Sequence, residues 1–304
     1  MSFSQNAKAE LCKTPMSRQC CVTAEAYGVL LYCNMFTSRE IRIVTKSLDF
    51  AQRLPKLFKE AFNHEFDTVP SVHIKGKQTF SITDSRAIED IFVKFGSDAK
   101  TTLAHHINLA LLEENCCKSA FLRGAFLAGG SISDPKKSYH LEIVTAHYNI
   151  SRETFALLLE LDFSPKDAAR TGNYVIYFKH SEAIEDFFTL IGATVSSMGI
   201  MSTKVEKDMR NAINRRVNCD SANADKIVSA AQVQLDAIRR IERGAGLDSL
   251  PEKLKEAALL RIANPAASLV DLAALSSPPV SKSCVSHRLR KLMELSRQGE
   301  TGHP

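Results

Sequence analysis

The chain has 304 residues, 44% apolar and 24% charged, a globular composition that excludes disordered, collagen-like and acidic-tail proteins. At roughly 100–200 residues per domain, this length predicts two or three domains. No apolar run approaches the ~18 residues of a membrane span, and Met1 to Met16 lacks the apolar core of a signal peptide. We therefore expect a soluble, cytoplasmic protein without membrane contact, and the adjacent pairs Cys20-Cys21 and Cys116-Cys117 are interpreted as reduced thiols.

The charge is distributed unevenly along the chain. Residues 1–199 contain 22 Lys and Arg against 22 Asp and Glu, whereas residues 200–304 contain 17 against 12, so the whole formal charge of +5 lies in the last third. An excess confined to one end favours a polyanionic partner for that end. Five charges in a hundred residues are also compatible with an ordinary solvated surface, so the inference needs a supporting motif.

After an N-terminal extension, residues 1–21, an internal repeat predicts a duplicated domain at 22–199, with copies at about 22–100 and 118–199. Ser85–Gly96 recurs as Ser181–Gly192, with seven of twelve positions identical at an offset of 96 residues. The same offset aligns the segments that begin at Gly28 and Gly124, and strand-like segments between these anchors match at an offset of 100. Because the matches occur in the same order, we interpret them as a tandem duplication.

Each copy has the pattern helix, strand, helix, two strands, helix, with an extra strand possible. In the first copy the elements are expected at 23–36, 40–45, 49–62, 71–74, 78–83 and from 85 onward. In the second copy they are expected at 118–132, 139–145, 152–161, 173–179 and from 181 onward. This order defines an α+β unit, and two copies should pack about a pseudo-twofold axis.

A basic linker and connecting helix are predicted at 200–246. The segment 209–219 is rich in Arg and Asn, which suits phosphate contact and the ordering of a linker equally well. The possible secondary DNA contacts are Arg210, Asn214, Arg215 and Arg216. Asp220 to Asn223 is predicted to cap a helix at 224–243.

A helix-turn-helix domain is predicted at 247–297, followed by a tail at 298–304. Pro251 suits the start of its first helix, and Asn264-Pro265 ends it, with Leu254, Ala257, Ala258 and Ile262 on the apolar face. Ser268 and Asp271 form a capping box for a short helix to Leu275. Ser281 can cap the last helix, which extends through Leu295. Three helices with a short middle one are typical of a helix-turn-helix.

At about 100° per residue, Val285, Leu289 and Leu292 form one apolar stripe on the last helix, opposite Ser283, His287 and Arg290. From 282 to 297 there are five Lys and Arg against one Glu. Early residues of a recognition helix reach bases and later cations reach phosphates. The DNA-binding residues are predicted to be Ser268, at the start of the short middle helix, and on the last helix Lys282, Ser283, Cys284, Ser286, His287, Arg288, Arg290 and Lys291. A solvated basic face on a protein-docking helix is the alternative.

These segments carry a resemblance to known families. Leu122 to Ser131 is similar to the LAGLIDADG helix of homing endonucleases. The chain as a whole resembles the WhiA family of cell-division and sporulation regulators of Gram-positive bacteria, through 121–144, 211–226 and 268–295. The resemblance implies a degenerate endonuclease-like domain followed by a DNA-binding helix-turn-helix.

The resemblance also locates the positions where the endonucleases carry acidic metal ligands, which here are Cys33 and Gly129. Neither residue can hold Mg²⁺, which requires oxygen ligands. Asp134 lies five residues further on and has no acidic counterpart in the first copy, where Ser38 is aligned. We therefore expect no enzyme activity, and no catalytic or metal-binding residue is predicted.

Other catalytic and metal-binding motifs are also incomplete. The Gly124–Ser131 segment imitates a phosphate-binding loop but has Gly130 where the lysine belongs. His105-His106 and the two cysteine pairs lack the two-residue spacing of a zinc site and are interpreted as ordinary side chains. No metal and no cofactor is therefore expected.

Two classes of function stay open. The first is a sequence-specific transcription factor bound to double-stranded DNA; the resemblance implies that it would regulate cell division, chromosome segregation or sporulation at the nucleoid. The second is an architectural or cell-division factor that acts mainly through protein partners, which the neutral first two thirds of the chain keeps open. The sequence does not specify the operator, the sign of regulation, the oligomeric state or the protein partners.

Overall fold

The computed structural model describes residues 2–70, 76–102 and 104–298. It divides into an N-terminal unit, Met1–Asp208, and a C-terminal unit, Met209–Pro304. Within the described residues, no helix combines the length and hydropathy needed to cross a membrane.

The N-terminal unit contains the predicted α+β duplication. The first copy consists of α2 (Gln19–Leu31), β1 (Met35–Phe36), β2 (Ile41–Thr45), α3 (Leu48–Phe62), β3 (Gln78–Ile82) and α4 (Ser85–Lys94). After a short 3₁₀ turn (Leu109–Leu112), the second copy consists of α5 (Asn115–Gly129), β4 (Gly130–Ile132), β5 (Leu141–Thr145), α6 (Tyr148–Glu160), β6 (Lys166–Arg170), β7 (Asn173–Phe178) and α7 (Ser181–Ile191). The duplicated fold class is confirmed, and the extra strand is present in both copies as β1 and β4.

Each copy forms one antiparallel sheet. The strand order is β1-β2-β3 in the first copy and β4-β5-β7-β6 in the second. Ile41, Ile43 and Thr45 are buried while the residues between them are half-buried, as the two-residue period predicts for a sheet with one face on the core. The strand expected at 71–74 lies outside the described residues.

Two expected helix ends were wrong. The helices expected to reach Phe36 and Ile132 end at Leu31 and Gly129, and the residues that follow enter the edge strands β1 and β4. Gly130 already has extended backbone angles. Phe36 and Ile132 are buried, so their apolar character reflects packing of the sheets and not continuation of a helix.

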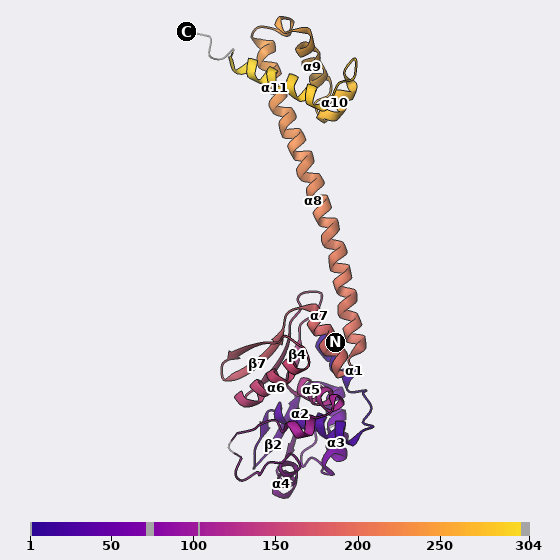
Figure 1. The fold of residues 1–304 in the computed structure, drawn as a ribbon, viewed down its shortest axis with the longest axis vertical. Helices are drawn as coiled ribbons and strands as arrows, with labels where there is room; N and C mark the ends of the chain where they lie inside the picture. The colour runs from indigo at the N-terminus through magenta and orange to yellow at the C-terminus, as the bar shows by residue number, and fades with distance from the viewer. Residues whose placement is uncertain (1, 71–75, 103, 299–304) are drawn as a thin grey trace. The chain divides into compact units, whose positions relative to one another are not determined.

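The helices α2 and α5 lie side by side at the centre of the N-terminal unit (Figure 1). Gly28 and Gly124 lie where the two helices meet. A Cβ atom on Gly28 would lie 2.1 Å from the carbonyl oxygen of Phe121, and one on Gly124 would lie 2.0 Å from that of Glu25. The helix backbones therefore touch directly, which only glycine allows at these two positions.

A buried ion cluster holds this helix pair to its surroundings. The Glu25 carboxylate of α2 accepts hydrogen bonds from Arg53 Nε at 2.6 Å and from Arg123 Nε at 2.8 Å. The side chains of Glu25 and Arg53 are only 2% and 4% exposed. Arg53 also donates to the carbonyl oxygens of Cys12 and Thr14. The cluster therefore joins elements of both copies with the N-terminal segment.

The N-terminal segment is part of this unit and not a separate extension, which corrects the expectation for residues 1–21. Helix α1 (Phe3–Leu11) starts at a capping box formed by Ser2 and Gln5. Ala7 and Leu11 are fully buried in the same core as α2 and α5. Because α1 is short and only weakly amphipathic, its docking depends on tertiary contacts that its sequence pattern does not predict.

Helix α8 (Thr194–Arg243) continues through the predicted linker. The helix expected from Ala224 begins thirty residues earlier, and the segment 220–223 is helical and caps nothing. No glycine or proline occurs between 200 and 243, so no residue interrupts the helix.

The C-terminal unit also contains a 3₁₀ turn (Leu247–Ser249), α9 (Glu252–Ala263), α10 (Leu269–Leu275) and α11 (Lys282–Gln298). Ile238 and Ile241 of α8 belong to the same core as Leu272 and Leu289. A domain that started at Leu247, as expected, would exclude Ile238 and Ile241 from the core to which they belong. We therefore place the start of this domain within the last turns of α8.

Candidate DNA-binding surface

Helix α11 has a buried face and an exposed polar face. Val285, Leu289 and Leu292 are 3%, 1% and 1% exposed, so the predicted apolar stripe is confirmed. The opposite face is exposed and carries Lys282, Ser283, Ser286, His287 and Arg290. None of these five side chains forms a hydrogen bond or ion pair with another residue in the described part of the chain. This face is thus free to contact a ligand.

The start of α11 is fixed by local capping and by α9. Ser281 Oγ accepts a hydrogen bond from the backbone N–H of Cys284 at 3.2 Å. The Glu256 carboxylate on α9 accepts from the N–H of Ser277 at 3.1 Å and from Arg288 Nη1 at 3.0 Å. One side chain therefore holds both the turn before α11 and the middle of α11.

Helices α9 and α10 are stabilised by a capping box, which was predicted, and by a buried arginine, which was not. The capping box of Ser268 and Asp271 is present, and these hydrogen bonds hold the pKa of Asp271 below its usual range. Arg261 is 2% exposed and donates to the carbonyl oxygen of Ala267 at 2.7 Å. Ile262, expected on the buried face of α9, is 39% exposed, because Arg261 takes that place.

The remaining predicted DNA-binding residues differ in accessibility. Arg288 is paired with Glu256 and its side chain is only 13% exposed, so its position does not support the predicted phosphate contact. Cys284 and Ser268 are half-buried, and Ser268 is engaged as a helix cap. Lys291 is exposed and only weakly paired with Glu294, one turn along the same helix.

The possible secondary contacts lie on α8, where every residue from 208 to 230 is exposed. Arg210, Asn214, Arg215 and Arg216 form no ion pair or side-chain hydrogen bond within the described part of the chain. They are accessible to an anionic partner, but their spacing places Asn214 and Arg216 on different sides of the helix.

The positions of the endonuclease metal ligands, Cys33 and Gly129, offer no carboxylate oxygen for Mg²⁺ here. The Cys33 thiol donates to the carbonyl oxygen of Met35 at 3.1 Å, and burial raises its pKa to about 12. A Cβ atom on Gly129 would lie 2.5 Å from the carbonyl oxygen of Val144, so there is no room for a longer side chain. The Asp134 carboxylate accepts from the N–H of Lys136 within its own turn. The residues present do not fit the two-metal chemistry of the endonucleases.

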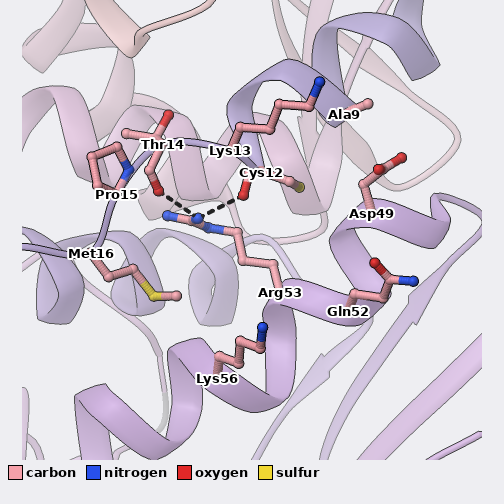
Figure 2. Close-up of a pocket in the computed structure, with 10 residues that line it drawn as sticks. All are labelled: Ala9, Cys12, Lys13, Thr14, Pro15, Met16, Asp49, Gln52, Arg53 and Lys56. Carbon is pink, nitrogen blue, oxygen red and sulfur yellow. Dashed lines mark hydrogen bonds between the residues drawn. The ribbon is translucent and has the colours of Figure 1, made fainter.

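A pocket of about 320 Å³ beside α1 and α3 contains Arg53 and Lys56 (Figure 2). Figure 2 shows the Arg53 guanidinium directed at the Cys12 and Thr14 carbonyl oxygens and not into open space. Arg53 Nε and Nη2 donate to the Glu25 carboxylate, so four of the five N–H groups of Arg53 are used within the protein. This pocket therefore reflects the structural ion cluster.

The histidines and cysteines singled out above have different positions. His105 Nε2 donates to the carbonyl oxygen of Phe36 at 2.7 Å, and burial lowers the pKa of His105. His106 pairs with Glu153 at 2.6 Å. The two cysteine pairs, in contrast, converge: their four Sγ atoms lie within 4.8 Å of one another. The sequence did contain a signal for this, because the pairs are separated by the repeat offset of 96 residues.

These features define a class of protein: a duplicated, degenerate LAGLIDADG-like domain followed by a helix-turn-helix domain. The WhiA LAGLIDADG-like domain matches residues 118–210, and the WhiA C-terminal HTH domain matches residues 213–296. The chain belongs to the WhiA family, since curated members match it over almost its whole length. The sequence-based resemblance is confirmed.

Two relatives are both named "Probable cell division protein WhiA". The protein from Ruminiclostridium cellulolyticum is 39% identical, over 98% of each chain. That from Alkaliphilus metalliredigens is 35% identical, over 97% of this chain and 98% of its own. Among solved structures, full-length DUF199/WhiA from Thermatoga maritima has a TM-score of 0.60 at 24% identity, covering 98% of this chain and 99% of that one, which supports the fold.

Proposed function

We propose that this chain is a sequence-specific DNA-binding regulator of cell division, chromosome segregation or sporulation in a Gram-positive bacterium, acting at the nucleoid. The observation that carries the proposal is the exposed polar face of α11, with Ser283, His287 and Arg290 opposite the buried stripe. A helix of this kind fits the major groove of double-stranded DNA, where its early residues meet base edges. The relatives' names support a role in cell division.

In this proposal the residues of α11 divide their roles. Lys282, Ser283, Ser286 and His287 lie in the first turns and contact bases, whereas Arg290 and Lys291 contact phosphates. Arg210, Arg215 and Arg216 on α8 would add phosphate contacts outside the helix-turn-helix. The N-terminal unit is not an enzyme and serves as a binding or scaffolding domain.

Substitutions on α11 test this division. Ser283→Ala or His287→Ala should lower affinity for a specific site by roughly 1–3 kcal/mol and relax preference at one base position. Arg290→Ala should weaken binding to all sequences and reduce the salt slope by about one charge. The measurement is a salt titration of full-length protein with a duplex recovered by genome-wide mapping and with a scrambled duplex.

Arg86→Ala is the matched control, because it removes one exposed positive charge from α4 of the N-terminal unit, outside the helix-turn-helix. It should leave both affinity and salt slope unchanged. If no mapped duplex binds better than random DNA, or if all three α11 substitutions act alike on both duplexes, sequence-specific reading by α11 is wrong.

The alternative function is an architectural or cell-division factor acting through protein partners. The observation that favours it is the absence of net charge from residues 1–199, since a neutral surface gains little from a polyanion. A protein of this kind would retain its cellular role when Ser283 and His287 are both replaced by alanine. Loss of that role with normal protein levels would favour DNA reading.

The proposed absence of catalysis has its own test. Purified protein should leave supercoiled plasmid intact in Mg²⁺ or Mn²⁺, under salt conditions where it binds DNA, because Cys33 and Gly129 cannot ligate these ions. Gel electrophoresis of the plasmid is the measurement. Metal-dependent nicking that Asp134→Ala abolishes would show that the domain has kept a nuclease centre.

A further inference from the structure

Four cysteines meet at one end of the central helix pair. Cys20 and Cys21 lie in the first turn of α2, and Cys116 and Cys117 lie in the first turn of α5. All four Sγ atoms lie within 4.8 Å of one another, and those of Cys20 and Cys21 are 3.9 Å apart. All four are free thiols. We call this group the cysteine cluster.

The convergence follows from the duplication. The offset of 96 residues that aligns Gly28 with Gly124 also aligns Cys20 with Cys116 and Cys21 with Cys117. Because α2 and α5 touch through their glycines, equivalent residues near the helix starts are brought together. The cysteine cluster lies at the opposite end of the helix pair from Cys33 and Gly129, since α2 rises roughly 17 Å between Cys20 and Leu31.

The sulfur separations fit one metal ion. Four thiolates around Zn²⁺ with Zn–S bonds of about 2.3 Å have sulfurs about 3.8 Å apart. The observed spacing, at most 4.8 Å, needs only a small inward movement of side chains. An iron–sulfur cluster places several irons and sulfides between the thiolates and so separates them further. A tetrahedral S₄ ligand set therefore favours mononuclear zinc.

The surroundings suit a ligand set of this charge. Four thiolates and one Zn²⁺ carry a net charge of −2, which a low-polarity site does not tolerate alone. Arg18 Nη1 donates to Cys116 Sγ at 3.8 Å, and the first turns of α2 and α5 present the positive ends of their helix dipoles. Cys117 is 3% exposed whereas Cys20 is exposed, which leaves a path for the ion to enter.

We propose that Cys20, Cys21, Cys116 and Cys117 bind one Zn²⁺ as a structural tetrathiolate site that joins the starts of α2 and α5. The site has all four positions occupied by protein, so it holds no open position for water or substrate. Its role is to fix the two copies of the duplicated domain to each other. It revises the sequence-based expectation that these cysteines are ordinary side chains.

The first test measures metal content. Full-length protein, purified with zinc supplied during expression and then dialysed against a mild chelator, should retain about one zinc per chain by elemental mass spectrometry. Cys20→Ser and Cys116→Ser should each lose most of this zinc. Cys219→Ser is the matched control, because Cys219 is an exposed thiol on α8 outside the cysteine cluster, and it should retain the metal.

A second test uses only the wild-type protein, so its result does not depend on whether the variants fold. Metal-free wild-type protein titrated with Co²⁺ should develop the intense visible bands of a tetrahedral thiolate site, saturate at about one equivalent, and lose them on addition of Zn²⁺. A strong chelator should lower the midpoint of thermal unfolding followed by tyrosine fluorescence. All six tyrosines lie between residues 27 and 177, so this signal reports the N-terminal unit.

Several outcomes would overturn the proposal. Protein that retains no zinc and gives no tetrahedral Co²⁺ spectrum would show that the cysteine cluster binds no metal of this kind. Equal zinc in Cys116→Ser and Cys219→Ser would place the ion elsewhere. Iron with acid-labile sulfide would identify a polynuclear cluster, and a disulfide within the cysteine cluster in protein purified under reducing conditions would identify a redox pair.

Discussion

Replacing Glu25 with glutamine should lower the free energy of unfolding of the N-terminal unit by about 3–5 kcal/mol. The Glu25 carboxylate is 2% exposed and is shared by Arg53 and Arg123, which approach it at 2.6 and 2.8 Å. The glutamine keeps the shape but removes the negative charge, so two buried guanidinium groups lose their counter-ion. Urea unfolding followed by tyrosine fluorescence measures this unit, because the chain has no tryptophan.

Glu89→Gln is the control for this substitution. Glu89 pairs with Lys100, but their side chains are 46% and 75% exposed, so solvent screens the interaction. The control should change stability by less than about 1 kcal/mol. If Glu25→Gln has an equally small effect, the buried ion cluster does not stabilise the fold.

Replacing Gly124 with alanine should destabilise the N-terminal unit by about 3 kcal/mol or more, the upper part of the range for overpacking. The new Cβ atom would lie 2.0 Å from the carbonyl oxygen of Glu25 and 2.9 Å from the backbone nitrogen of Val29. These are backbone atoms, so the clash is relieved only by moving α2 away from α5.

The sign of this effect separates packing from helix propensity. Alanine is favoured over glycine within a helix by roughly 1 kcal/mol, so propensity alone predicts that Gly124→Ala stabilises. Gly199→Ala is the control, because a Cβ atom there would lie 3.6 Å from its nearest neighbour, the Phe3 ring, which is ordinary contact. A stabilising or neutral Gly124→Ala substitution would show that the two helices are not in close contact in solution.

Much of the fold could be predicted from the sequence because its signals are local or repeated. The two-residue period placed β2 and β5, and the recurrence of Ser85–Gly96 placed α4 and α7. In the C-terminal unit, Ser281 predicted the start of α11, and the apolar stripe that begins at Val285 predicted its buried face. Each of these features depends on residues a few positions apart, so chain geometry alone determines them.

The candidate site was only partly predictable, for the same physical reason. The exposed face of α11 follows from helical spacing, but the pairing of Arg288 with Glu256 joins residues 32 positions apart and withdraws one expected phosphate contact. Arg261 is charged yet buried, and the Ala267 carbonyl oxygen accepts its hydrogen bond. Helical periodicity does not predict which charged side chains form ion pairs or hydrogen bonds with residues distant in the sequence.

By itself, the sequence determined that this protein is a duplicated α+β domain followed by a helix-turn-helix, because periodicity, capping and repetition act along the chain. Only the tertiary structure decided how α1 docks, where the C-terminal core begins, and that Arg53 and Arg123 share Glu25. It also brought Cys20 and Cys116 together across 96 residues. The Glu25 cluster and the convergence of the cysteines depend on the crossing of α2 and α5 at Gly28 and Gly124, where two backbones meet without side chains between them.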